Sequence, residues 1–264
     1  DAVNLSSSKL NKVKHNVPVF GLAKTKHKPT WGLDPDGIIL IPCFTFSIFT
    51  APRIGKWRTI FETLPKIADK IKWENRVKKV MWRGARTGDR WWLTGIGERR
   101  NDSSLDIEFI DWKPSKLNPY YSNNFKTIQQ YCQYKYLVHQ EGWSYSNRLK
   151  YLLLCGSPVI YANFYGWEEY WYHLLKHNHN ILVFKDKGNE KSFKNLTNAI
   201  IHNDQKAKFI GKNGKALVEK YLNEQAVLCY FRNVLIEYGK LFTYIPIRHP
   251  NAVKIDEFLV GYSS

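Results

Sequence analysis

The sequence predicts an α/β protein built on a parallel, doubly wound sheet. From residue 77 onward, short apolar runs alternate with longer segments that carry a helical period. Each pair of successive apolar runs leaves room for a crossover helix, which is the pattern of a parallel sheet. The chain has 264 residues, 44% of them hydrophobic, so it can build one large domain or two compact ones.

The predicted elements of this region alternate in chain order. Strands are expected at 77–82, 105–110, 136–139, 158–161 and 181–184. Helices are expected at 90–100, 125–131, 144–154, 167–175 and 191–202, with two more at 207–221 and 224–242. Such sheets bind ligands beyond the C-terminal ends of their strands. The loops after strands 77–82 and 136–139 are therefore the candidate site.

The region before residue 77 is less regular. Residues 17–22 and 38–41 are apolar enough for strands, and the sequence Asp-Pro-Asp-Gly at 34–37 is typical of a turn. Residues 57–73 have the period of an amphipathic helix. We expect that helix to break near Pro65, because proline removes a backbone donor.

Charge and cysteine content narrow the function and the compartment. The formal net charge of +17 favours anionic partners. Cys43, Cys132, Cys155 and Cys229 form no CxxC pair, so neither zinc nor a disulfide framework is expected, and Cys155 is expected to be a core residue. No apolar run is long enough for a membrane span. The visible sequence predicts a cytoplasmic protein, or one of the ER or Golgi lumen if a signal peptide was trimmed.

The loop after strand 136–139 has the composition of an anion site. Gly142 permits a tight turn, and Ser144 or Ser146 can cap the helix that follows. The free N–H groups of a helix start attract phosphate, and Arg148, one turn into the helix, can reach back over the same anion. The alternative is a capped core helix that carries a surface arginine.

The loop after strand 77–82 carries three arginines. Arg83, Arg86 and Arg90 lie within eight residues, in the sequence RGARTGDR. Arginines in a second loop at the same sheet edge make a phosphate clamp plausible. The alternative is a solvated basic turn, but the two loops together favour a phosphate-containing ligand.

Several segments together resemble glycosyltransferase family 90, the family of the protein O-glucosyltransferases. The sequence KYLVHQEGWSYSNRLKYLLLCGSPVIY at 135–161 resembles the family signature, and WRGARTGDR resembles its arginine loop. The segments PVFGLAKTKH and DPDGIILIP resemble an earlier part of the family, and VLCYFRNVLIEYGKLFTY resembles its C-terminal region. The resemblance covers nearly the whole chain.

The resemblance implies a GT-B architecture, with two Rossmann-like domains and a donor cleft between them. The implied division is an acceptor-side domain at 1–76, completed by a C-terminal helix at 232–264, and a UDP-sugar domain at 77–231. It also implies transfer of xylose or glucose from a UDP-sugar to a hydroxyl of a glycan or protein, inverting and metal-independent, with no cofactor beyond the donor.

The family's roles transfer by position onto the two loops. Arg90 and Arg148 would hold the diphosphate, and Arg83 and Arg86 would support the arginine loop. The remaining residues would line the nucleotide: Gly142, Trp143, Ser144, Tyr145, Ser146 and Asn147.

The catalytic base is where the chain departs from the family. The family's aspartate falls near Ser7 in this sequence. An inverting transfer needs a carboxylate or histidine near the acceptor hydroxyl, so Asp34 and Asp36 are candidates, with Asp36 the one chosen. An alternative gives the same Asp-x-Asp pair a Mn²⁺ or Mg²⁺ ion.

A different class of function remains open on composition. The basic charge and the aromatic residues beside lysines would also suit a nucleic-acid-binding module. However, the lysines spread along the whole chain and no RNA or DNA motif is present, so the enzyme is preferred.

Overall fold

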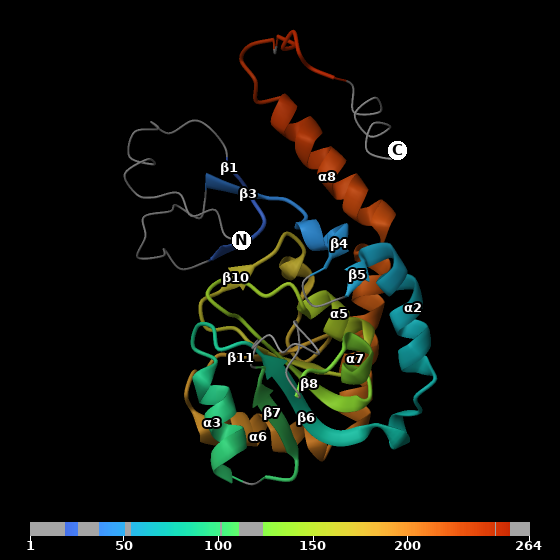
Figure 1. Ribbon diagram of the computed structural model, residues 1–264, viewed down its shortest axis with the longest axis vertical. Coiled ribbons are helices and arrows are strands. Elements are labelled where there is room, and N and C mark those ends of the chain that lie inside the picture. Colours follow the sequence, from blue (N-terminus) through green and yellow to red (C-terminus); the bar gives the residue numbers. More distant parts are fainter. Residues whose placement is uncertain are drawn as a thin grey trace, which may run out of the picture.

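A computed structural model describes residues 19–25, 37–50, 54–100, 102–110, 124–245 and 247–253. Its centre is a five-stranded sheet with the strand order β11-β9-β8-β6-β7, in which all neighbours run parallel (Figure 1). The predicted α/β class and parallel sheet are therefore confirmed. The strands are β6 (Val77–Gly84), β7 (Leu105–Phe109), β8 (Tyr134–Gln140), β9 (Val159–Ala162) and β11 (Leu182–Phe184).

The strand order creates one switch point. From β6 the chain goes outward to β7, then returns to β8 on the other side of β6 and continues to β9 and β11. The connections after β6 and β8 leave the sheet in opposite directions, so a crevice opens at the C-terminal ends of these two strands.

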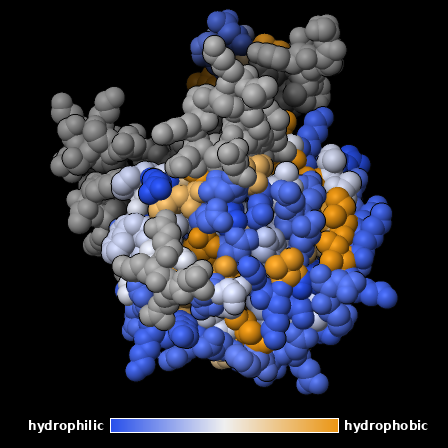
Figure 2. Space-filling model, turned by 60° about the horizontal axis from the view of Figure 1, so that its bottom comes forward, coloured by the Kyte–Doolittle hydropathy of each residue, from blue (hydrophilic) through white to orange (hydrophobic). Residues whose placement is uncertain are grey.

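Helices pack on both faces of the sheet. One face buries α2 (Trp57–Asp69), α4 (Ile128–Tyr131) and α5 (Leu149–Leu154), and the other buries α3 (Trp91–Arg100) and α6 (Glu190–Ile201). The helix α7 (Asp204–Tyr221) contributes to both cores. The face of the molecule in Figure 2 is mainly hydrophilic, with hydrophobic residues in small separate groups. None of the described helices is both long and apolar enough to cross a bilayer.

The first part of the chain forms short pairs of strands against this body. β1 (Val19–Gly21) pairs in parallel with β3 (Ile38–Leu40), and β4 (Ile48–Phe49) pairs with β5 (Gly55–Lys56). The last helix, α8 (Glu224–Gly239), reaches back to them, since the Tyr230 hydroxyl donates to Leu40 O at 2.8 Å. The predicted domain boundaries stay predictions.

The helix predicted at 167–175 and the predicted break at Pro65 are both wrong. Residues 167–175 instead form β10 (Trp167–Glu168), paired with β2 (Lys24–Thr25), and a 3₁₀ turn at Tyr172–Leu174. The buried Glu141 carboxylate accepts the backbone N–H groups of Phe164, Tyr165 and Trp167, which fixes the turn that leads into β10. Pro65 does not break α2, because the apolar face of that helix is anchored in the core on both sides of the proline.

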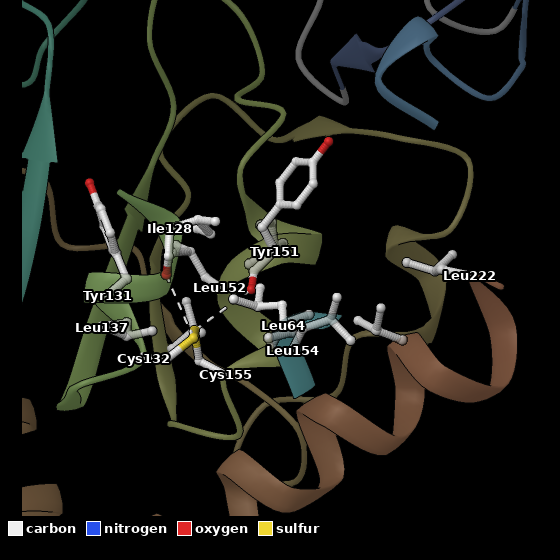
Figure 3. Packing of buried hydrophobic residues seen from close by; sticks show 14 of the residues in the cluster. Leu64, Ile128, Tyr131, Cys132, Leu137, Tyr151, Leu152, Leu154, Cys155 and Leu222 are labelled. Atoms are coloured by element: carbon white, nitrogen blue, oxygen red, sulfur yellow. Dashed lines mark hydrogen bonds between the residues drawn. A yellow bond between two sulfur atoms is a disulfide. The ribbon is translucent and has the colours of Figure 1, made fainter. Parts of the chain in front are cut away.

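The expectation that the chain forms no disulfide is wrong. Cys132 at the end of α4 is bonded to Cys155 at the end of α5, 23 residues later. The bond lies inside the core among Leu64, Leu152 and Leu154 (Figure 3). Cys155 is therefore a core residue as expected, but a cross-linked one. Sequence spacing could not pair the two cysteines, because the crossover through β8 brings them together.

Removing this disulfide should destabilise the fold. A Cys132→Ala/Cys155→Ala variant is expected to lose roughly 3 kcal/mol of unfolding free energy, because the cross-link restricts the unfolded chain. Urea unfolding measures the loss. Cys229→Ala, which changes an exposed free cysteine on α8, is the control and should stay within about 0.5 kcal/mol of wild type. An unchanged double variant would contradict the assignment.

Candidate functional site

A cavity of about 460 Å³ opens at the switch point of the sheet, a volume typical of small-molecule sites. Its wall is formed by the ends of β6 and β7, the segment 146–148 after β8, the start of α4, and the region around β4 and β5. The lining residues are Phe49, Ile54, Gly84, Ala85, Arg90, Ile110, Phe125, Lys126, Ile128, Tyr131, Ser146, Asn147 and Arg148.

The two predicted loops pack directly against each other. Gly88 has φ +57°, and a Cβ at this position would lie 2.3 Å from Gly142 O. A Cβ on Gly142 would lie 3.0 Å from Thr87 Oγ1 and 3.2 Å from an Arg90 nitrogen. Gly88 and Gly142 therefore allow the close approach of the two loops, whereas the sequence predicted only a tight turn at Gly142.

Arg90 joins the two loops. Its Nε donates to Glu141 O at 3.0 Å and its Nη2 to Gln140 O at 3.1 Å, on the loop after β8. Its Nη1 donates to Thr87 Oγ1 at 2.8 Å, on its own loop. The side chain is buried, yet it still contributes to the cavity wall, so it brings a positive charge to the site.

Arg148 adds a second guanidinium. Its Nη1 donates to Arg83 O and to the Tyr131 hydroxyl, the latter at 3.1 Å. Among the described residues, its Nε and Nη2 make no hydrogen bond, which leaves donors for a ligand. The side chain is half-buried and lines the cavity beside Arg90.

The two guanidiniums of the site repel each other. Burial, followed by the nearby Arg148 charge, lowers the pKa of Arg90 to about 9. The same two arginines act on His139 at the end of β8: burial first, then their charges, lower the pKa of His139 well below its ordinary value. His139 is thus neutral at pH 7. Its two ring nitrogens have no hydrogen-bond partner in the described part of the chain.

Arg83 and Arg86 point away from the cavity. Arg83 is buried and bonded to Asp106 and Glu108 of β7, with 3.1 Å to the Glu108 carboxylate. Although burial opposes it, bonds from Tyr134 and Arg83 lower the pKa of Asp106 below its ordinary value. The Arg86 guanidinium lies 4.3 Å above the Phe109 ring. Both positions fit a supporting role, and direct contact with substrate stays a prediction for both.

The predicted helix cap after β8 is wrong. The helix α5 begins at Leu149, with Arg148 as its N-cap residue and no side-chain cap, so Ser144 and Ser146 belong to the preceding turn. A helix that begins at 144 would carry the chain away from Arg90, whereas a Gly142 N to Ser144 O bond of 2.9 Å closes a tight turn there.

Only some of the residues after β8 that were predicted to contact the nucleotide line the cavity. Ser146 and Asn147 line the cavity with Arg148, and Gly142 lies behind Arg90. Trp143 is 75% exposed, and Tyr145 is buried beneath the loop. Contact of the nucleotide with Trp143, Ser144 and Tyr145 therefore stays a prediction.

Sequence reasoning missed the apolar wall of the cavity. Phe49, the last residue of β4, and Ile54, just before β5, line the same cavity as the arginines. Phe125 lies before α4, and Ile128 begins that helix. Tyr131, at the end of α4, is tied to both arginine loops through Arg83 O and Arg148. Only the aromatic residues around Phe49 gave any signal, and a core strand explains them equally well.

A larger cavity, of about 680 Å³, lies at the opposite edge of the sheet beside β11. Its described lining has one lysine, Lys185, and no arginine, and the two carboxylates of Glu168 and Asp186 would repel a phosphate. The cavity between β6 and β8 is therefore the better site for an anion.

The residues considered for the catalytic base and for a metal ion do not belong to the described part of the chain. Asp34, Asp36 and Ser7 lie outside the described residues. Within the described ranges, no group of three or more His, Cys, Asp or Glu side chains could hold a metal ion. Metal independence and the role of Asp36 stay predictions.

The sheet and its cavity define an α/β protein with a buried cationic site at its switch point, suited to a phosphate-containing ligand. Comparison with known families agrees: the model of glycosyl transferase family 90 matches residues 3–262. The chain belongs to glycosyl transferase family 90, as its signature segments predict.

Curated relatives carry O-glucosyltransferase names. The Aedes aegypti O-glucosyltransferase rumi homolog is 29% identical over 92% of this chain and 60% of its own length. Protein O-glucosyltransferase 1 of Rattus norvegicus is 28% identical over 90% of this chain and 61% of its own length. The chain thus spans about three fifths of the length of the curated relatives it matches.

Solved structures give a distant likeness. Anabaena HepE in complex with UDP and glucose has a TM-score of 0.44 and 13% identity, and the match covers 80% of this chain and 59% of HepE. Sucrose-phosphate synthase from Thermosynechococcus elongatus has a TM-score of 0.43 and 14% identity over 78% of this chain and 53% of its own. Likenesses at this level support no statement about function.

The close approach of the two loops can be tested at Gly88. Gly88→Ala should lower the unfolding free energy by roughly 1–3 kcal/mol, because it combines a positive φ with a clash on Gly142 O. Gly188→Ala shares the positive φ, +75°, but meets nothing within 4 Å. It controls for backbone strain alone. Equal losses in the two variants would argue against a tight contact between the loops.

Proposed function

We propose that this chain transfers glucose from UDP-glucose to a hydroxyl group of a protein acceptor. The observation that carries the proposal is the pair Arg90 and Arg148 in the switch-point cavity of a family 90 chain. The names of the relatives support glucose as the sugar and protein as the acceptor.

The cavity suits the diphosphate of a UDP-sugar. Two guanidiniums in a buried site form strong, charge-assisted bonds with phosphate oxygens. Because Arg90 is committed to the loop backbones, Arg148 supplies the freer donors. Phe49, Ile54 and Phe125 offer apolar surface for the flat parts of the nucleotide and sugar.

The transfer itself would proceed with inversion and without a metal. The acceptor oxygen attacks the anomeric carbon, the bond from that carbon to the diphosphate breaks, and the acceptor proton passes to a base. The arginines would stabilise the negative charge that develops on the leaving UDP, which is the role a divalent cation would otherwise take. Asp36 remains the proposed base.

Glucose and xylose differ by one hydroxymethyl group, and a pocket discriminates such a group by only about 1–3 kcal/mol. UDP-xylose is therefore the second donor to test. The family match favours an enzyme over the nucleic-acid-binding alternative, because an anionic UDP-sugar substrate would explain the basic charge.

Replacing Arg148 should weaken the donor site. Arg148→Ala is expected to raise the Kd for UDP roughly 10- to 100-fold, because a charge-assisted bond contributes about 1.5–3 kcal/mol. Calorimetry with UDP measures the affinity, and hydrolysis of UDP-glucose with and without EDTA measures activity and metal need. We expect the activity to survive EDTA.

Arg58→Ala is the matched control, because Arg58 is an exposed arginine of α2 paired with Glu62. It should bind UDP as wild type does. Wild-type affinity in Arg148→Ala, or a wild-type chain that binds no UDP, would overturn the proposed site.

A further inference from the structure

A buried polar cluster lies next to the cavity and joins two distant segments of the chain. Cys43 and Thr45 come from the 3₁₀ turn at Phe44–Phe46 and the residue before it, whereas Asn147 lies just before α5 and Lys150 lies in its first turn. Cys43 is 2% exposed, and Thr45 and Lys150 are 0% exposed. A lysine so deeply buried needs a reason, because its ammonium loses all contact with water.

Hydrogen bonds connect the four side chains in series. Lys150 Nζ lies 2.5 Å from Thr45 Oγ1 and 3.4 Å from Asn147 O. Thr45 Oγ1 lies 2.6 Å from Cys43 Sγ, and Cys43 Sγ lies 3.1 Å from Asn147 Oδ1. The series therefore runs from the lysine to a residue of the cavity wall.

The ammonium sets the direction of the series. A protonated lysine can only donate, so Thr45 Oγ1 accepts from it, and the hydroxyl proton is directed at Cys43 Sγ. Burial, the main influence, raises the pKa of the Cys43 thiol, so the thiol keeps its proton and donates to Asn147 Oδ1. In this arrangement each group of the series has a hydrogen-bond partner, and the Glu169 carboxylate lies near the same thiol.

The last member of the series faces the ligand site. Asn147 lines the cavity between Ser146 and Arg148. Because its oxygen is held by Cys43, the group that this amide offers to a ligand is its N–H₂. The Asn147 side chain interacts with the buried Tyr145 hydroxyl of the same cluster, and a primary amide has a second N–H that it can donate to a ligand.

We propose that Lys150, Thr45 and Cys43 are positioning residues that fix the Asn147 amide as a hydrogen-bond donor to an acceptor oxygen of the UDP-sugar. The inference rests on the proposed function, since it deepens the role of the same cavity. It makes the segment around Thr45 a determinant of the affinity for the UDP-sugar, although that segment lies about a hundred residues before Arg148.

Glu169 decides which variants can test the inference. Its carboxyl group is buried, interacts electrostatically with Lys150, and lies near the polar groups of Trp171, Tyr172 and Cys43. Replacing Lys150 would leave this carboxylate uncompensated, and the fold could fail for that reason alone. Thr45 and Cys43 are therefore the positions to change.

The experiment compares variants that break the series with variants that keep it. Thr45→Val and Cys43→Ala remove a donor, and should weaken UDP binding roughly 3- to 10-fold and raise the KM for UDP-glucose more than they lower kcat. Thr45→Ser and Cys43→Ser keep a hydroxyl and should stay within about twofold of wild type. Calorimetry and thermal unfolding are measured on each protein.

Two further variants separate positioning from a loss of packing. Thr63→Val and Cys229→Ala change an exposed threonine of α2 and an exposed cysteine of α8, and should leave UDP binding unchanged. In an Asn147→Ala background, Thr45→Val should have no further effect on UDP affinity, because the amide it positions is gone.

The outcomes distinguish the two proposals. Wild-type UDP affinity in Thr45→Val, or an equal loss with and without Asn147, would overturn the positioning role while leaving the UDP site intact. A wild-type chain that binds no UDP would instead overturn the proposed function, and the positioning role with it.

Discussion

The arrangement of the site depends on one buried guanidinium. Arg90 donates to the backbone of the loop after β8 and to a side chain of its own loop. It therefore holds the two loops together beside the crevice that the strand order opens. Gly88 and Gly142 allow the two loops to approach closely enough for these bonds to form. The charge that holds the loops together is also the charge that lines the cavity.

Because Arg90 both joins the loops and lines the cavity, the site favours an anionic ligand. The backbone carbonyls around Arg90 are dipoles, and they compensate its full charge only in part, while Arg148 adds a second positive charge nearby. A diphosphate at the C-terminal ends of β6 and β8 would supply the missing negative charge where a doubly wound sheet binds its ligand. The apolar wall from Phe49 and Ile54 then encloses that ligand from the first part of the chain.

The sequence was informative where local pattern decides structure. Apolar runs and helical periods predicted the parallel sheet, and arginines after two strands indicated the loops that meet. It was misleading where distant residues decide: the Glu141 carboxylate fixes the turn that leads into β10, where the sequence pattern predicted a helix from residue 167. Nor could spacing reveal that Cys132 bonds to Cys155, or that Cys43 and Thr45 lie against Asn147, because the fold alone brings those residues together. The choice of Asp36 as the base follows from the need for a carboxylate near the acceptor, since the family's base position falls near Ser7, and both residues lie outside the described part of the chain.

The most direct test of the account is a crystal structure of this chain with UDP. The account predicts that the diphosphate lies in the cavity between β6 and β8, within hydrogen-bond distance of Arg148 and next to the Asn147 amide. UDP in the larger cavity beside β11, or a diphosphate that makes no contact with either Arg90 or Arg148, would contradict it.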